Sequence, residues 1–161
     1  MYKRQPFDEP SRIRTVISAD LDNDGYDEIF LNYIGEPNKL FRILENGLIK
    51  QIPLDIGLEP DGYGTGAAVA DIDNDGVLEL LVSHGESRDQ PLSLYKAKVN
   101  PEHKYLRIRP LNKYGAPARG ATVTLISNLR KHSKTIDSGS GYLCQMEPVA
   151  HYGIRLSLIH I

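Results

Sequence analysis

Short apolar stretches alternate with polar, glycine-bearing turns along the first hundred residues. Each stretch is too short for a helix and most are rich in β-branched residues, so each predicts a β-strand. Asn46-Gly47 separates two of these stretches, a pattern typical of a β-hairpin. The predicted strands are residues 13–19, 29–31, 40–44, 48–52, 67–70, 80–82 and 91–97. The pattern predicts an all-β fold.

The chain also contains an internal repeat, because residues 19–31 recur without a gap as residues 70–82. In each copy an acidic loop lies between two predicted strands. Each repeat therefore predicts a roughly four-stranded sheet of about 50 residues, and such sheets in tandem are typical of β-propeller blades. Two blades cannot close a ring and would leave apolar faces exposed. The sequence thus predicts a fragment of a longer protein.

Acidic residues occupy positions one, three, five and nine of each loop, and glycine occupies position six. Calcium takes six to eight oxygen ligands, which carboxylates and backbone carbonyls supply together. We therefore predict two Ca²⁺ sites, one per loop, with the position-seven carbonyl as a further ligand. Carboxylates this close repel one another unless a cation is bound, so binding should be coupled to folding. The predicted ligands are Asp20, Asp22, Asp24, Tyr26 and Glu28 in the first loop, and Asp71, Asp73, Asp75, Val77 and Glu79 in the second.

Three alternatives to these calcium sites are weaker. Aspartate, asparagine and glycine also favour ordinary turns, but turn chemistry does not require the same carboxylate spacing twice. An EF-hand needs helices on both sides and a glutamate at position twelve, which is Leu31 in one copy and Val82 in the other. Magnesium prefers octahedral sites that keep several waters.

A second β-rich unit follows residue 100. Its predicted strands are residues 105–109 and 121–126, with glycine-rich turns at 112–120 and 137–141, the latter leading into residues 142–146. We interpret the basic run 130–134 as a solvated loop, with contact to an anionic glycosaminoglycan as the alternative. The predicted domains are residues 1–100, divided at about 10–58 and 59–100, and residues 101–155.

Charge and cysteine content narrow the function classes. The chain has 161 residues and a net charge of −2, which indicates neither a nucleic-acid partner nor membrane insertion. The first residues lack the pattern of a signal peptide. Cys144 and His151 could be imagined as nucleophile and base, but nothing supplies an orienting third group. We therefore predict no catalytic residue and a structural or disulfide-bonded Cys144.

The motifs resemble known families. The two acidic loops resemble the FG-GAP repeat of integrin-type β-propellers. Residues 64–71 resemble the strand that leads into the loop of that repeat. Residues 114–121 and 138–153 resemble the ASPIC/UnbV domain, and the order of both units resembles the cartilage acidic protein 1 family. This resemblance implies two blades of an FG-GAP β-propeller followed by a partial ASPIC/UnbV module.

The same resemblance implies a secreted extracellular location, with extracellular-matrix or cell-surface receptor proteins as partners. Residues 156–161 depart from the family pattern and match what a transposase sequencing adapter encodes. We predict that this tail is not native. The predicted function is a calcium-binding interaction protein of the matrix without catalysis. The alternatives are an enzyme on a propeller scaffold and a fragment of an integrin-like adhesion receptor.

Overall fold

The computed structural model describes residues 7, 10–53, 63–85, 89–127, 130–137 and 139–155. These residues form eleven β-strands and no helix, so the predicted all-β fold is confirmed. Within the described part of the chain there is also no helix with the length and hydrophobicity to cross a membrane. The predicted non-native tail, residues 156–161, lies outside the described residues.

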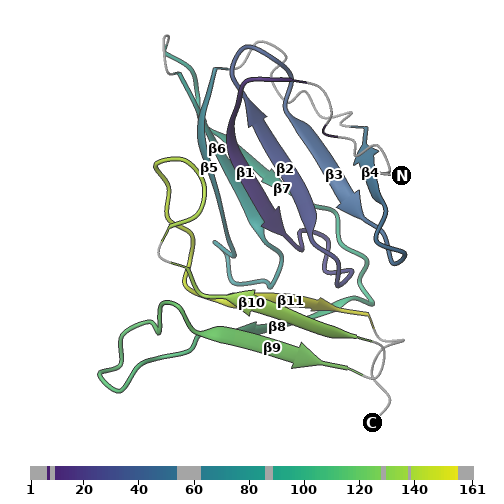
Figure 1. Ribbon diagram of the computed structural model, residues 1–161, viewed down its shortest axis with the longest axis vertical. Helices are drawn as coiled ribbons and strands as arrows, with labels where there is room; N and C mark the ends of the chain where they lie inside the picture. The colour runs from purple at the N-terminus through teal and green to yellow at the C-terminus, as the bar shows by residue number, and fades with distance from the viewer. Residues whose placement is uncertain are drawn as a thin grey trace.

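The first sheet contains four antiparallel strands in sequence order: β1 (Ile13–Ala19), β2 (Glu28–Tyr33), β3 (Lys39–Ile43) and β4 (Ile49–Ile52) (Figure 1). The predicted hairpin is confirmed between β3 and β4. The Gly47 amide donates to the Leu44 carbonyl at 2.8 Å, and the Leu44 amide donates to the Leu48 carbonyl at 2.8 Å. Gly47 has φ of 76°, as in a three-residue hairpin loop that ends in a left-handed residue.

The second sheet contains β5 (Gly64–Ala70), β6 (Glu79–His84) and β7 (Ser93–Lys96), again antiparallel and in sequence order. The sequence predicted about four strands per repeat, but among the described residues this sheet has three. The reason is the path of the chain: after β7 it continues through residues 97–103 into the C-terminal part instead of turning back beside β7.

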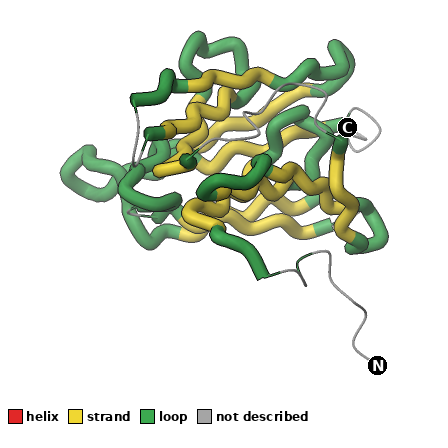
Figure 2. The backbone as a smooth tube through the Cα atoms, turned by 90° about the horizontal axis from the view of Figure 1, so that it is seen from above, coloured by secondary structure: helices red, strands yellow, loops and turns green. Residues whose placement is uncertain are grey.

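The two sheets share one hydrophobic core. Strands β1 and β2 contribute Ile17 and Phe30, each 1% exposed, and strand β6 contributes the fully buried Val82. Side chains alternate between the two faces of a strand, so every second residue of β1 points into this core. Seen from above, the two sheets lie in adjacent layers (Figure 2). The packing fixes the ends of both sheets, and therefore both acidic loops, next to each other.

Residues 104–155, here called the C-terminal unit, form two small sheets below the ends of the first two (Figure 1). One pairs β8 (Lys104–Ile108) with β11 (Ala150–Ile154), and the other pairs β9 (Thr122–Ile126) with β10 (Lys131–Thr135). Ile136, Ala150 and Tyr152 form the core between them. The predicted strands 105–109 and 121–126 are confirmed as β8 and β9, each within one residue at either end.

Two interpretations of the C-terminal unit were wrong or incomplete. The basic run 130–134 is not a solvated loop, because most of it is strand β10, paired with β9. Its residues alternate between exposed and half-buried, and the half-buried Lys134 makes an ion pair with Asp27 at 2.8 Å. Strand β11 was not predicted, because Ala150–Ile154 contains a glycine, which is uncommon in strands, and only one β-branched residue.

Candidate metal centre

The two acidic loops adopt the same backbone turn. The first loop, residues 20–28, joins β1 to β2, and the second loop, residues 71–79, joins β5 to β6. Position four is left-handed in both, with φ of 58° at Asn23 and 61° at Asn74. Position six is also left-handed, with φ of 87° at Gly25 and 82° at Gly76. Asparagine and glycine tolerate this conformation better than other residues, so the repeated sequence produces a repeated shape.

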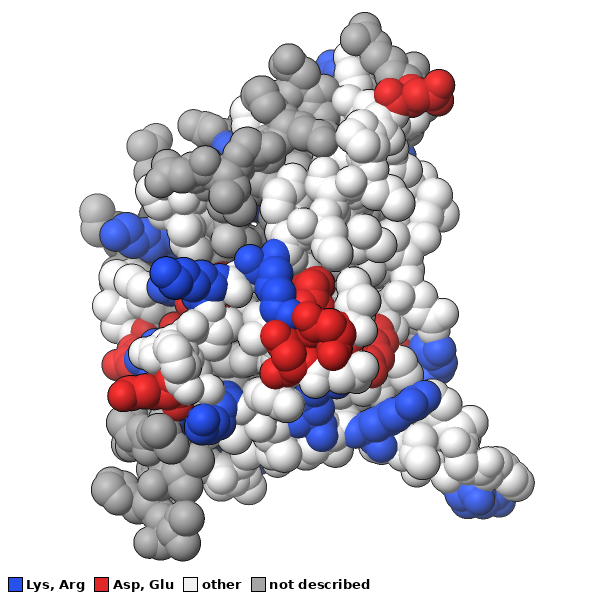
Figure 3. Space-filling model, turned by 180° about the vertical axis from the view of Figure 1, so that it is seen from behind, with Lys and Arg blue, Asp and Glu red and all other residues white. Residues whose placement is uncertain are grey.

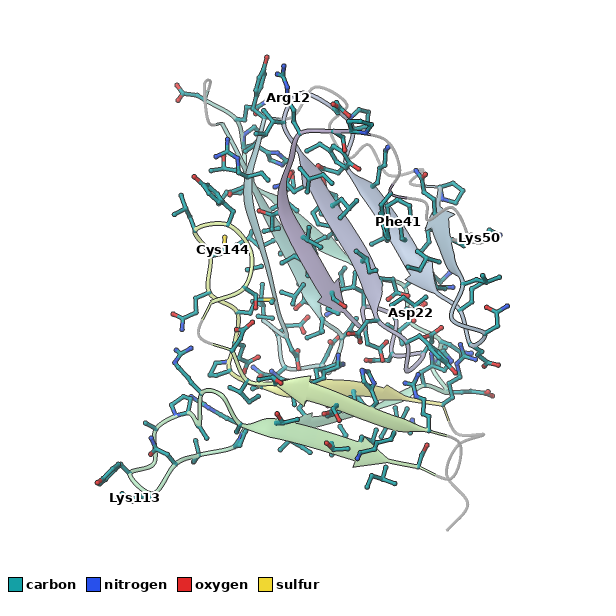
Figure 4. The ribbon with its side chains drawn as sticks, in the orientation of Figure 1. Arg12, Asp22, Phe41, Lys50, Lys113 and Cys144 are labelled. Atoms are coloured by element: carbon teal, nitrogen blue, oxygen red, sulfur yellow. The ribbon has the colours of Figure 1, made fainter. Side chains whose placement is uncertain are left out.

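Three of the predicted ligand positions converge in each loop. Asp20, Asp22 and Glu28 each offer one carboxylate oxygen, and these oxygens all lie within 4.8 Å of one another. Asp71, Asp73 and Glu79 do the same in the second loop. Figure 4 shows Asp22 at the end of the first sheet that faces the C-terminal unit. Positions one, three and nine therefore form a three-carboxylate cluster twice.

Backbone amides orient the carboxylates of the first loop. Asp20 Oδ2 accepts a hydrogen bond from the Gly25 amide at 2.9 Å, which closes the turn. Glu28 Oε2 accepts from the Leu21 amide at 3.0 Å, which ties the end of the loop to its beginning. Both carboxylates are buried, with Asp20 at 0% and Glu28 at 2% exposure.

The second loop repeats these bonds. Asp71 Oδ2 accepts from the Gly76 amide at 3.1 Å, and Glu79 Oε2 accepts from the Ile72 amide at 2.8 Å. Both side chains are buried as well. The two loops thus hold their first and ninth carboxylates by the same local hydrogen bonds.

One oxygen of each position-one aspartate has no hydrogen-bond partner in the described part of the chain. Asp20 Oδ1 and Asp71 Oδ1 are buried and lack a partner among the residues that the structure describes. A buried acceptor left without a partner costs about 1–3 kcal/mol, and more when it is charged. An oxygen-binding cation in the three-carboxylate cluster would satisfy it. The donor set is all oxygen, which fits calcium.

Position five lies outside the three-carboxylate cluster. Its carboxylate accepts a hydrogen bond from the position-seven amide, at 2.8 Å between Asp24 Oδ1 and Tyr26 and at 2.9 Å between Asp75 Oδ1 and Val77. That bond shapes the turn. The roles of Asp24 and Asp75 as ligands, and of the Tyr26 and Val77 carbonyls, stay predictions.

A basic side chain faces each cluster from the third strand of its sheet. Arg42 on β3 lies directly across from Glu28, and its Nε is 3.2 Å from Glu28 Oε1. Lys96 on β7 lies directly across from Glu79, and its Nζ is 2.5–2.8 Å from three carboxylates of the second loop. Sequence analysis missed both residues. The only available signal was a basic residue in the third predicted strand of each repeat.

Burial and mutual repulsion raise the pKa values of the carboxyl groups in the first cluster. Burial raises the pKa of Asp20 to about 7 and that of Glu28 to about 8, and the neighbouring Asp22 carboxylate adds to the rise at Glu28. Burial also raises the pKa of Asp22, with a further contribution from Asp24. Without a cation, Asp20 and Glu28 therefore hold protons near neutral pH. A divalent ion would stabilise their charged forms.

The C-terminal unit also reaches both loops. The Gly153 amide donates to Asp20 Oδ2 at 2.8 Å, and Arg107 Nη1 is 2.8 Å from Asp71 Oδ2. On the rear face, acidic side chains gather at mid-height with lysine and arginine side chains beside them (Figure 3). The sequence did not indicate these contacts, because they join residues far apart in the chain.

Cys144 and His151 have different neighbours. Cys144 is a half-buried free cysteine whose sulfur lies beside Gly66 of β5. The buried His151 instead donates from Nε2 to Asn23 Oδ1 at 2.7 Å. Cys144 and His151, considered above as nucleophile and base, thus contact different parts of the fold.

Two regions of the chain match known protein families. Residues 20–82 match the FG-GAP-like repeat, and residues 112–157 match the family described as ASPIC and UnbV. The chain is 47% identical over 159 residues to cartilage acidic protein 1 of Xenopus tropicalis and 48% identical over 157 residues to that of Homo sapiens. These alignments cover 93% and 92% of this chain, and 25% and 24% of the two relatives. The chain therefore spans about a quarter of the length of the curated relatives it matches.

Proposed function

We propose, on the premise that this chain belongs to the cartilage acidic protein 1 family, that it is part of a secreted, calcium-binding interaction protein of the extracellular matrix. The observation that carries the calcium assignment is the duplicated cluster: three carboxylates converge at positions one, three and nine of both loops. The buried Oδ1 atoms of Asp20 and Asp71, which have no hydrogen-bond partner among the residues that the structure covers, support it further.

The proposed role of calcium is structural. Asp20, Asp22 and Glu28 would hold one ion, and their counterparts Asp71, Asp73 and Glu79 the other. A bound calcium ion supplies positive charge that offsets the repulsion between carboxylates and links the two strands on either side of the loop. The loops would then stiffen the ends of both sheets that face the C-terminal unit.

The proposed partners are extracellular-matrix or cell-surface receptor proteins. The similarity to proteins named cartilage acidic protein 1 supports an extracellular role. The proposal contains no catalytic step. Calcium would act by holding the blade loops in one shape so that the surrounding surfaces keep a fixed geometry for binding.

Calcium uptake by loop variants tests the calcium assignment. We would change Asp22→Asn in the first loop and Asp73→Asn in the second, because neither carboxylate is held by the C-terminal unit. Asp89→Asn, an exposed aspartate outside the loops, is the matched control. Isothermal titration calorimetry and metal analysis of the protein should show one calcium ion fewer in each loop variant and none fewer in the control. Unchanged uptake in both loop variants would rule out the two proposed sites.

A further inference from the structure

The C-terminal unit contacts the position-one aspartate of each loop. The Gly153 amide donates to Asp20 Oδ2, and the Arg107 guanidinium pairs with Asp71 Oδ2. In both loops this is the oxygen that already accepts the hydrogen bond from the position-six glycine. The other oxygen, Oδ1, is the buried one without a partner among the described residues. The C-terminal unit therefore fixes the rotation of the carboxylate that presents the free oxygen.

The same unit packs on the position-six glycine of each loop. A Cβ added at Gly25 would lie 3.1 Å from Arg130 Nη2 and 3.2 Å from the Gly153 carbonyl. A Cβ added at Gly76 would overlap the ring of Tyr105. Glycine is thus needed at position six for its positive φ and also for the close approach of the C-terminal unit.

Asn23 joins the two loops to each other and to the C-terminal unit. Its Nδ2 donates to the carbonyl of Gly76 in the second loop at 2.9 Å, and its Oδ1 accepts from His151 Nε2 at 2.7 Å. Asn23 is 2% exposed, so separating these parts would leave a buried amide without partners. Asn23 therefore links the first loop directly to the second loop and to β11.

Further contacts at the edge of this interface involve other residues of the first loop. Arg155 Nη2 is 2.7 Å from Asp24 Oδ2, and Lys134 Nζ is 2.8 Å from Asp27 Oδ1. His103 Nδ1 lies 3.1 Å from the Asp22 carbonyl. The first loop thus meets the C-terminal unit along most of its length.

We propose that calcium binding by the two loops and docking of the C-terminal unit are one coupled equilibrium, with the C-terminal unit acting as a positioning layer for both calcium sites. This inference rests on the proposed calcium function. Docking holds Asp20 and Asp71 with Oδ1 free for an ion, and an ion holds the loops in the shape that accepts Gly153 and Tyr105. Coupling of this kind is reciprocal. If calcium raises the docking equilibrium constant by some factor, docking raises the affinity for calcium by the same factor.

The substitution Gly153→Ala tests this coupling. Its Cβ would overlap Asp20 Oδ2 and the Asn23 backbone, so it opposes docking. Gly139→Ala is the matched control, because its nearest neighbour, the Cys144 carbonyl, is 3.6 Å away. By calorimetry we expect Gly153→Ala to weaken calcium binding between about fivefold and about 150-fold, and Gly139→Ala to leave it unchanged. Equal affinity in Gly153→Ala and the unmodified protein would overturn the proposal.

Measuring the second loop alone separates coupling from a local effect on Asp20. In an Asp22→Asn background the remaining calcium uptake reports the second loop, which Gly153 does not touch. The coupled equilibrium predicts that Gly153→Ala weakens this site too, because Arg107 and Tyr105 move with the rest of the unit. A second loop that keeps its full affinity would contradict the proposal.

Hydrogen exchange of the unmodified protein gives a test that does not depend on how a variant folds. We expect calcium to slow amide exchange of strand β11, residues 150–154, relative to the protein with chelator. Exchange that is equal in both conditions, with calcium uptake confirmed by titration, would overturn the coupling and leave the proposed calcium function standing. An absence of calcium uptake would overturn both.

Discussion

Asp20 and Asp71 each divide their two carboxylate oxygens between different environments. Oδ2 accepts hydrogen bonds within the loop and a donor from the C-terminal unit, while the buried Oδ1 has no partner in the described parts of the chain. Position five behaves differently, because Asp24 and Asp75 shape the turn by bonding the position-seven amide. Residues of the same type in one loop therefore have distinct roles.

At the residue scale, calcium affinity should depend on pH. The pKa of Asp20 is about 7 and that of Glu28 about 8, both raised by burial above the values of the free side chains. Calcium needs the deprotonated carboxylates, so affinity should be full at alkaline pH and fall as pH drops through 8 and 7. Between pH 8 and pH 6 a group with a pKa near 7 weakens binding by about tenfold, and Glu28, with its pKa near 8, adds to this loss. Titrations at both pH values would measure this.

Proton release offers an independent measurement of the same effect. Calorimetry in two buffers with different ionisation enthalpies should show protons released at pH 7 on calcium binding to the unmodified protein. Glu28→Gln, which cannot titrate, should release fewer. Affinity that does not change from pH 6 to pH 8 would show that these carboxyl groups are already ionised without calcium.

At the element scale, the third strand of each sheet places a basic side chain beside the acidic loop. Pairing of β2 with β3 places Arg42 opposite Glu28, and pairing of β6 with β7 places Lys96 opposite Glu79. The pairing register of the strands, and not the sequence of the loop, therefore fixes the position of each basic side chain. Lys96 Nζ lies within 2.8 Å of Asp73, Asp75 and Glu79 oxygens, which raises its own pKa through those contacts.

Replacing that lysine should strengthen the second calcium site. The ammonium group occupies the oxygens that a calcium ion would bind, so it competes with the ion. We expect Lys96→Gln to raise the affinity of the second loop by about tenfold, the order expected for removing one competing charge at a partly screened site. Lys98→Gln, exposed and two residues further along, should have no effect. Equal affinities in the two variants would show that Lys96 moves aside without cost.

At the scale of the whole molecule, two packed sheets and the C-terminal unit meet around the acidic loops. Ile17 and Phe30 pack with Val82 across the sheets, and Asn23 bonds both the second loop and His151. The loops therefore lie where three parts of the fold meet. Under the proposed function, an ion bound there would stabilise the contacts between these parts as well as a single turn.

Calcium should raise the melting temperature of the protein. A ligand that binds only the folded state adds about 2.7 kcal/mol per site at a hundredfold excess over its Kd. Differential scanning calorimetry with calcium and with chelator would measure the shift, and the double variant Asp22→Asn with Asp73→Asn should lose it. Magnesium should give a smaller shift, because it keeps its waters and needs stricter geometry. A melting temperature indifferent to calcium would contradict a structural role for the ion.

The predicted resemblance to the cartilage acidic protein 1 family is confirmed over more than nine-tenths of the chain, with the FG-GAP-like and ASPIC/UnbV regions in the predicted order. The resemblance depended on sequence motifs: the acidic loops, residues 114–121 and residues 138–153. The predicted strands and the turn at Asn46-Gly47 depended instead on local patterns of neighbouring residues. Strand β10 was missed because a basic run indicates a solvated loop unless its pairing with β9 is known.

Sequence alone predicted the β-strands of the two sheets, a turn at each acidic loop and a gathering of its carboxylates, of which the first, third and ninth converge. All of these depend on contacts within one repeat. Only the tertiary structure decided that Gly153 and Arg107 hold Asp20 and Asp71, and that Asn23 bonds across to Gly76. Hydrogen bonds between residues 53 or 133 positions apart follow from how separate units pack, and no local pattern encodes that packing.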